Sequence, residues 1–337
     1  MNIKEVAAKA GVSITTVSRV LNSPDKVNEN TRTKVLSVME ELDYTPNWFA
    51  RNLQNSRTNI IGVIMPDTLQ SSNMEIAKGV ETIAHKHNCN IILVDTGYDE
   101  MHEQAQVSSL IERKIDGLIL IQSLLDRKKI DYIRSKKIPY VFVEKCESSE
   151  GENLVYTDYD EATQEVIDYL ADMGRRKIAV ILPDNQSYIN KEKLKGYESA
   201  LKEKGLSFEE NYIIRTDNTL EGGYVATSRL LDDIKPDAIL AATDTLAFGA
   251  IESVKQNGYT ADEIGVVGFE GLEAGAVVEP KLTTVIKPSY RMGLTAGRIL
   301  FDLIEDDGSD ESNSIMLQSR MKIRKSCGNK ERIREIW

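Results

Sequence analysis

Residues 3–22 read IKEVAAKAGVSITTVSRVLN and predict two short helices joined by a tight turn. Apolar residues recur at helical spacing in the first of them, at Val6, Ala7 and Ala10. Gly11 can end this helix, because glycine adopts the left-handed backbone conformation at low cost. Ser13 can begin the second helix, since its hydroxyl accepts a hydrogen bond from an otherwise unpaired backbone N–H.

The second predicted helix directs its apolar residues inward and leaves its N-terminal end and outer face free. Its predicted core residues are Val17, Val20 and Leu21. This is the geometry of a helix-turn-helix, whose second helix offers its N-terminal side chains to base edges in the major groove. An ordinary helical hairpin is the alternative. A third amphipathic helix is predicted over residues 31–42, with these residues facing inward: Val35, Leu36, Val38, Met39 and Leu42.

The segment 44–53 reads YTPNWFARNL and follows this third helix. Together with residues 3–22 it resembles the lactose-repressor (LacI/GalR) family, in which the same motif of two short helices leads to a tyrosine, a Pro-Asn pair, an Ala-Arg pair and a leucine. The rest of the chain also resembles that family. The resemblance implies a sequence-specific DNA-binding regulator, most often a repressor of carbohydrate-metabolism genes, that a small-molecule effector controls.

The resemblance also implies which residues contact DNA. Ile14 and Thr15 stand where the family discriminates between bases, and Arg19 stands where the family contacts guanine through its guanidinium fork. Leu53 matches the hinge leucine that inserts into the minor groove. The alternative for Arg19 is a surface salt bridge, and the alternative for Leu53 is a position in the hydrophobic core. The remaining predicted DNA contacts are Ser13, Thr16, Ser18, Asn22, Thr31, Asn47 and Ala50.

Composition and charge fit such a reading. The 337 residues exceed one typical domain, and the net charge is −11. Residues 1–58 carry eight Lys and Arg against six Asp and Glu, whereas the remainder carries 34 against 47. Only the N-terminal end can therefore approach phosphate groups, and two tethered copies would compensate for its weak charge. The absence of an apolar leader or span predicts a cytoplasmic protein, and three scattered cysteines predict free thiols.

Beyond residue 58, short apolar runs alternate with helical patterns, as in parallel βαβ sheets. The predicted fold class is α/β, with an all-α helix-turn-helix headpiece and a core of two doubly wound parallel-sheet subdomains, as in periplasmic binding proteins. We expect the headpiece over 1–46, a hinge helix and linker over 47–58, the core over 59–327 and a tail over 328–337. The N-subdomain comprises 59–155 plus 288–313, and the C-subdomain 156–285 plus 314–327.

A ligand crevice is expected beyond the carboxyl ends of the strands, between the two subdomains. Glu144, Lys193 and Glu270 stand where the resemblance implies aspartate, arginine and aspartate, so the site differs from the usual one. A lysine cannot form the two-pronged contact of an arginine. A carbohydrate remains the ligand class that the resemblance implies, and rim ion pairs are the alternative. The other candidate residues are Ser71, Ser72, Asn73, Gln122 and Asp244.

No glycine-rich phosphate loop, nucleophile elbow or metal-ligand spacing occurs, so no enzyme activity, cofactor or metal is predicted. The resemblance implies a homodimer, with the regions 74–87, 130–136 and 274–278 as candidate contacts. A second reading makes the effector a phosphorylated carrier protein, for which Tyr290 and Arg298 match part of a docking helix and Arg291 does not. A sugar-binding protein without a regulatory role is a third reading.

Overall fold

The computed structural model describes residues 2–22, 24–44, 57–185, 187–305 and 312–329. The chain forms two compact units. The first contains Met1–Asn59 and Lys114–Asp116, and the second contains Ile60–Arg113 and Gly117–Trp337. Each unit has its own hydrophobic core.

The first unit is a small helical headpiece. It consists of α1 (Ile3–Ala10), α2 (Ile14–Asn22), a 3-10 turn η1 (Pro24–Lys26) and α3 (Glu29–Glu41). Asn2 caps α1 in a reciprocal capping box with Glu5, and Gly11 ends it at φ 65°. Both the glycine stop and the short helix that follows were predicted from the sequence.

The headpiece core confirms most of the predicted apolar residues. Val6, Ala7 and Ala10 of α1 pack against Val17 and other residues of α2 and α3. The prediction for Leu36 was wrong, because its side chain is 44% exposed. It follows Val35, which is fully buried, and consecutive helical residues point about 100° apart.

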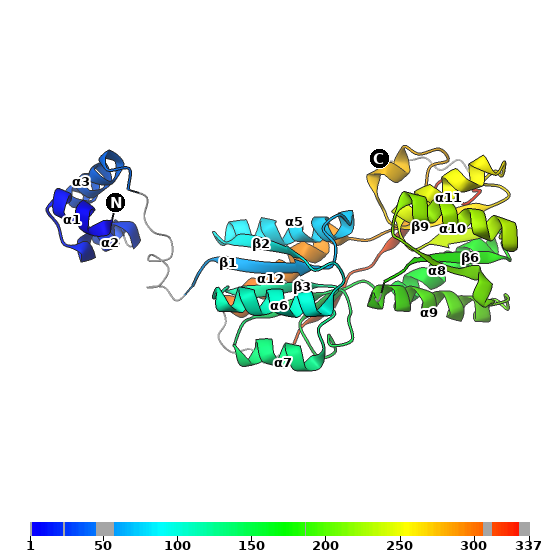
Figure 1. The fold of residues 1–337 in the computed structure, drawn as a ribbon, viewed down its shortest axis with the longest axis horizontal. Helices are drawn as coiled ribbons and strands as arrows, with labels where there is room; N and C mark the ends of the chain where they lie inside the picture. The colour runs from blue at the N-terminus through cyan, green and yellow to red at the C-terminus, as the bar shows by residue number, and fades with distance from the viewer. Residues whose placement is uncertain (1, 23, 45–56, 186, 306–311, 330–337) are drawn as a thin grey trace. The chain divides into compact units, whose positions relative to one another are not determined.

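The second unit contains two six-stranded sheets with helices packed on them (Figure 1). The first sheet has the order β11-β5-β4-β3-β1-β2 and is parallel throughout. The second has the order β12-β10-β9-β8-β6-β7, in which only the β12 pairing is antiparallel. The predicted fold class of an all-α headpiece followed by two doubly wound α/β subdomains is confirmed.

Each sheet and the helices around it form one lobe. The lobe with the first sheet is called the first lobe, and the lobe with the second sheet is called the second lobe. The first lobe contains β1 (Ile60–Met65), α5 (Ser71–Lys86), β2 (Asn90–Asp95), α6 (Glu100–Glu112), β3 (Gly117–Ile121), α7 (Arg127–Ser135), β4 (Tyr140–Val143), β5 (Leu154–Tyr156), α12 (Ser289–Glu305) and β11 (Ser314–Met316). The second contains α8 (Tyr159–Asp172), β6 (Ile178–Pro183), α9 (Tyr188–Glu203), η2 (Glu210–Tyr212), β7 (Ile213–Thr216), α10 (Leu220–Asp233), β8 (Ala238–Ala241), α11 (Asp244–Gln256), β9 (Gly265–Glu270), η3 (Glu273–Ala276), β10 (Thr283–Ile286) and β12 (Arg320–Lys322).

The chain therefore crosses between the lobes three times, after β5, after β10 and after β11. The alternating pattern over 315–324 favours one strand, but this region forms two short strands, one in each sheet. The segment 282–288 leads to the second crossing and also contributes β10. Strands β5 and β7 were not predicted, because each has only three or four residues and β7 ends in two polar ones.

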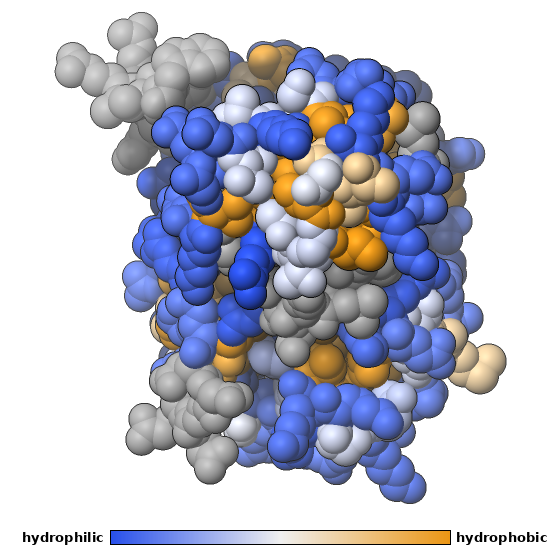
Figure 2. Space-filling model, turned by 90° about the vertical axis from the view of Figure 1, so that its left-hand side faces the viewer, coloured by the Kyte–Doolittle hydropathy of each residue, from blue (hydrophilic) through white to orange (hydrophobic). Residues whose placement is uncertain are grey.

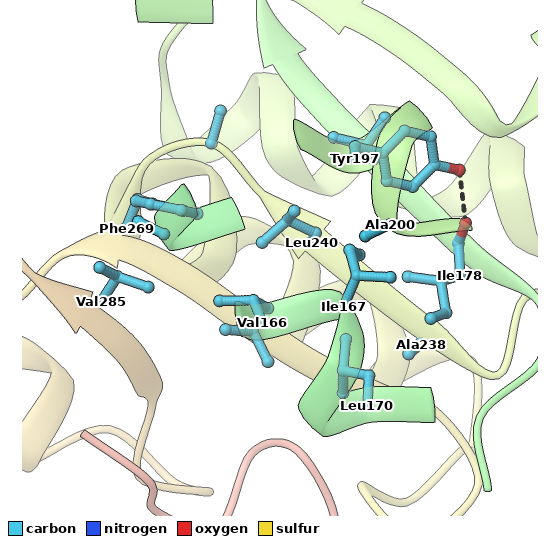
Figure 3. Close-up of a cluster of buried hydrophobic side chains, with 14 of the residues drawn as sticks. Val166, Ile167, Leu170, Ile178, Tyr197, Ala200, Ala238, Leu240, Phe269 and Val285 are labelled. Atoms are coloured by element: carbon cyan, nitrogen blue, oxygen red, sulfur yellow. Dashed lines mark hydrogen bonds between the residues drawn. The ribbon is translucent and has the colours of Figure 1, made fainter. Parts of the chain in front are cut away.

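Small and apolar side chains hold the layers together. Glycines let α5 and α12 approach closely, since a Cβ at Gly293 would lie 2.0 Å from the carbonyl oxygen of Ile76. In the second lobe, Val166, Ile167 and Leu170 of α8 pack beside the sheet (Figure 3). The buried hydroxyl of Tyr197 donates a 2.7 Å hydrogen bond to the carbonyl oxygen of Ile178, as Figure 3 shows. Each lobe therefore has a closely packed interior.

Hydrophilic side chains cover most of the face in Figure 2, where apolar side chains occupy several separate areas. Apolar runs without polar alternation are typical of strands buried on both faces, but Leu93 of β2 is exposed, because β2 is an edge strand. Within the described part of the chain, no helix is long and apolar enough to cross a bilayer. The three cysteines are free thiols.

Candidate functional site

The headpiece presents the N-terminal end of α2 to solvent. The hydroxyl of Ser13 accepts a 3.1 Å hydrogen bond from the backbone N–H of Thr16, which caps the helix as predicted. Ile14 is 44% exposed, and Thr15 and Arg19 are also exposed. Because buried residues hold the opposite face of α2, these three side chains are free to contact another molecule.

The other predicted DNA contacts lie elsewhere on α2 and α3 or outside the described residues. Thr16 and Ser18 on α2 are half-buried, as is Thr31 in the first turn of α3. Asn22 is the last residue of α2. The remaining three, Asn47, Ala50 and Leu53, lie outside the described residues.

The second unit contains a cleft between its lobes, at the carboxyl ends of the strands. Hydroxyl, amide and aromatic side chains of both lobes line it, together with Lys193, Glu270 and Lys287. The cavity that remains between them measures about 30 Å³, close to the volume of one water molecule. A larger ligand therefore needs the lobes, or the lining side chains, to move apart.

Three predicted effector residues occupy unusual backbone positions at strand ends. Gln122 follows β3 at φ 49°, Glu144 follows β4 at φ 72°, and Glu270 ends β9 at φ 121°. Side chains rarely adopt such conformations, and the strain costs of order 1–3 kcal/mol for each residue. Such residues concentrate at functional sites, which supports the prediction that the cleft binds a ligand.

Glu144 is a fully buried carboxylate that contacts residues of the segments that cross between the lobes. The ammonium of Lys287, just after β10, lies 2.9 Å from its Oε1. The Tyr159 hydroxyl donates to the same oxygen at 2.6 Å, and the backbone N–H of Thr157 donates to the other at 3.2 Å. Glu144 thus connects β4 to two of the three crossings.

Lys193 of α9 is buried and held by its own lobe. Its ammonium donates to the carbonyl oxygen of Ala242 at 2.6 Å. It also lies over the rings of Phe269 and Tyr159, at 4.4 and 5.1 Å from their centroids. Burial lowers the pKa of this lysine to about 8, against the opposing attraction of Glu270. An ammonium held in this way acts as a positive charge near the cavity.

Glu270 reaches from the second lobe to the first. Its Oε1 accepts a 2.6 Å hydrogen bond from the amide of Gln70 and a long one of 3.5 Å from Ser72. Burial raises the pKa of this carboxyl, although the hydrogen bond from Gln70 and the charge of Lys193 act in the opposite direction.

The structure places Asp244 beneath the cleft, since it is fully buried and the neighbouring Thr243 lines the cavity instead. Its carboxylate accepts hydrogen bonds from the hydroxyl of Thr284 at 2.6 Å and from the backbone N–H of Leu272 at 2.7 Å. Asp244 thus connects the start of α11 to the start of β10 and to the segment that follows β9. This geometry is that of a positioning residue.

Asp244 also predicts a pH effect on stability. Burial raises its pKa from the usual 3.8 to about 7, so at intermediate pH the folded chain holds a proton that the unfolded chain has lost. The contribution of this proton to the free energy of unfolding is fully present below about pH 4 and is lost as the pH rises through 7. Between pH 6 and 7, we expect the wild type to lose about 1 kcal/mol relative to Asp244→Asn in urea unfolding curves. Parallel curves for the two proteins would contradict this assignment.

The first turn of α5 contributes unequally to the cleft. Ser72 lines the cavity, whereas Ser71 is exposed. Asn73 is fully buried, and its amide donates to the carbonyl oxygen of Asp67 at 2.9 Å and to Gln70 at 3.1 Å. Asn73 in turn accepts a 3.0 Å hydrogen bond from Gln122, so it orients two cavity residues.

Sequence reasoning missed several residues of the cleft, above all Lys287 and the lining residues Gln70, Tyr98, Tyr159 and Phe269. Lys287 follows an apolar strand-like run, as Gln122 and Glu144 do, and this signal could have identified it. Tyr159 and Gln70 stand at helix starts, where no residue pattern distinguishes a cleft position from a surface one.

Two family models match this chain. Residues 2–47 match the model described as "Bacterial regulatory proteins, lacI family". Residues 58–326 match the model described as "Periplasmic binding proteins and sugar binding domain of LacI family". The two matched ranges correspond to the headpiece and to the two-lobed core.

Individual proteins agree with these models. Catabolite control protein A of Priestia megaterium is 33% identical over 329 residues, which cover 97% of this chain and 99% of that protein. The structure of the transcriptional regulator CelR in complex with cellobiose is similar at a TM-score of 0.72 and 26% identity, covering 97% and 99% of the two chains. The lac repressor dimer bound to operator and the anti-inducer ONPF reaches a TM-score of 0.86 at 24% identity over the same shares, which supports the fold. The chain therefore belongs to the LacI family of DNA-binding transcriptional regulators.

Proposed function

We propose that this regulator represses genes of carbohydrate metabolism by binding a pseudo-palindromic operator as a homodimer. The observation that carries the proposal is the exposed N-terminal end of α2 on a separately packed headpiece. Residues 1–46 act as the headpiece, 47–58 as the hinge and linker, and 59–327 as the effector-binding and dimerisation core. The protein acts by binding and not by catalysis.

Selection from random double-stranded DNA tests this function. A two-headed reader should recover a site with two-fold symmetry, because each headpiece reads one half-site. Recovery of no preferred sequence would contradict the proposal. The assay uses the full chain at a stated salt concentration, since phosphate contacts make affinity salt-dependent.

Arg19→Ala should relax specificity at one base pair in each half-site. A guanidinium that pairs with the O6 and N7 atoms of guanine contributes about 1–3 kcal/mol of discrimination there. The measurement is the affinity for operators substituted at each position in turn. A uniform loss over all sequences would instead make Arg19 a phosphate contact, and Arg32→Ala on the exposed surface of α3 serves as the control.

We propose that a sugar or sugar derivative binds in the cleft and controls the regulator. Hydroxyl and amide side chains beside the rings of Tyr98 and Phe269 suit a polyhydroxylated ligand. Ser71, Ser72, Asn73, Gln122, Glu144, Lys193, Asp244 and Glu270 remain the effector residues predicted from the sequence. A thermal-shift screen with sugars, sugar phosphates and sugar acids tests the ligand class, because a ligand at 100 times its Kd adds about 2.7 kcal/mol of stability.

The similarity to a catabolite control protein favours a second candidate, in which a phosphorylated carrier protein is the effector. Tyr290, Arg291 and Arg298 are exposed on α12, as a docking surface requires. A phosphorylated carrier protein that raises operator affinity, with no effect after Arg298→Ala, would favour this candidate over a sugar.

A further inference from the structure

Two helices that begin at the cleft differ from their neighbours in how they start. Asp99, Asp158 and Thr219 each cap a helix through a side-chain hydrogen bond to its first turn. Gln70 at the start of α5 and Ser187 at the start of α9 occupy the same position without such a bond. Their side chains are directed elsewhere, and in both cases the partner lies in the other lobe.

Gln70 makes the shorter of these two contacts. Its amide nitrogen donates to Oε1 of Glu270 at 2.6 Å, across 200 positions of sequence. The carbonyl oxygen of the same amide accepts a 3.1 Å hydrogen bond from Asn73, which fixes the direction of the donor. Glu270 meets it from a strained backbone at φ 121°. Both partners of this contact are therefore held in place before they meet.

Ser187 makes the reciprocal contact from the second lobe. Its hydroxyl lies 3.4 Å from Oε1 of Gln122, whose amide nitrogen donates to Asn73 at 3.0 Å. Asn73 therefore connects the two contacts, because it orients both Gln70 and Gln122. The 2.6 Å contact is to a charged oxygen and the 3.4 Å one is between neutral groups, so Gln70 should dominate.

From these contacts we infer that Gln70 and Ser187 form a latch that holds the two lobes together when no effector is bound. The inference rests on the proposed function in one respect, namely that an effector enters this cleft. The latch groups fill the place in which a ligand would contact Glu270 and Gln122, and the space left is only about 30 Å³. An effector must then compete with the chain's own amide, so Gln70 determines both the resting lobe angle and the selectivity for ligand.

The test measures the distance between the lobes in the full chain without effector or DNA. Spin labels are placed by Met101→Cys on α6 and Val225→Cys on α10, which are 77% and 57% exposed in the native chain. Cys89→Ser removes the one cysteine that is not buried. The doubly labelled chain is mixed with an excess of unlabelled chain, so that each oligomer carries at most one labelled pair. Double electron–electron resonance then gives the distribution of distances between the two labels.

Gln70→Ala should lengthen the mean separation, and Ser187→Ala should lengthen it less. The control is Lys191→Met, which removes an exposed ion pair with Glu147 across the same lobes and should leave the distribution unchanged. Unchanged distances in Gln70→Ala with a native circular dichroism spectrum would overturn the latch.

Gln70→Glu gives a second readout in a single sample. The substitution places a second carboxylate opposite that of Glu270, so at pH 8 the lobes should be further apart than in Gln70→Ala. At pH 5 one proton can be shared between the two carboxylates, and the lobes should close again. The other charged groups that act on this position are Lys193, Lys287 and Asp244, with Glu75 nearby, so the same pH series on Gln70→Ala serves as the control. A pH-independent distance in this variant would also overturn the latch. Neither measurement depends on DNA binding, so failure of the proposed function would show separately in the operator selection.

Discussion

Lys287→Met should lower the free energy of unfolding by about 3 kcal/mol. The ammonium of Lys287 is the cation nearest to Glu144, at 2.9 Å, and both side chains are almost fully buried. Removal of one partner leaves a buried charge without compensation, which typically costs about 3–5 kcal/mol. Hydrogen bonds from Tyr159 and Thr157 remain and place the expected loss at the lower end. Urea unfolding at neutral pH measures it.

The double variant Lys287→Met with Glu144→Gln identifies the cause of this loss. If the unpaired carboxylate is responsible, removing its charge as well should restore half or more of the stability, because a buried pair is often replaceable by neutral groups. The glutamine keeps an oxygen that can accept from the Tyr159 hydroxyl. Lys191→Met removes a cation from an exposed pair with Glu147 and should change little. A double variant as unstable as the sum of the two single ones would contradict the pairing.

The Glu144 cluster shows what the sequence could predict and what it could not. Glu144 was predicted to lie in the cleft because the resemblance implies an effector residue at this strand end, and the carboxyl ends of parallel strands share one edge of a sheet. Its partner Lys287 lies 143 positions away on another crossing segment. The pairing depends on how the lobes meet, and local pattern carries no information on that.

Asp244 and Gln70 show the same limit from opposite directions. Asp244 also follows an apolar strand, but its carboxylate accepts hydrogen bonds from Thr284 and from the Leu272 backbone. The strand end was predicted correctly, yet the side chain at that end does not line the cavity. Gln70 was not among the predicted site residues, although its amide crosses the cleft. Strand ends can be located from apolar periodicity, whereas the direction of a side chain depends on neighbours that are distant in sequence.

Val17→Ser should lower operator affinity by up to about tenfold for each headpiece that must be folded to bind, because an unfolded headpiece cannot read DNA. Val17 is fully buried in a headpiece core of only a few side chains. A core of this size supplies about 3–5 kcal/mol, and a serine there removes about 2–4 kcal/mol through lost burial, a cavity and an unpaired hydroxyl. A loss of this size leaves a fraction of the headpieces unfolded, and in these Ile14, Thr15 and Arg19 lose their common helix.

Leu36→Ser is the matched control, because Leu36 is 44% exposed in the same unit, contrary to the prediction from periodicity. It should retain operator affinity within a few-fold, since little apolar surface is lost. The measurement is fluorescence anisotropy with the selected operator. The thermal unfolding of the two-lobed core, residues 59–327, is recorded for each variant. The core packs separately from the headpiece, so it should melt alike in both variants. Equal losses of affinity in the two variants would mean that α2 does not require its buried face to read DNA.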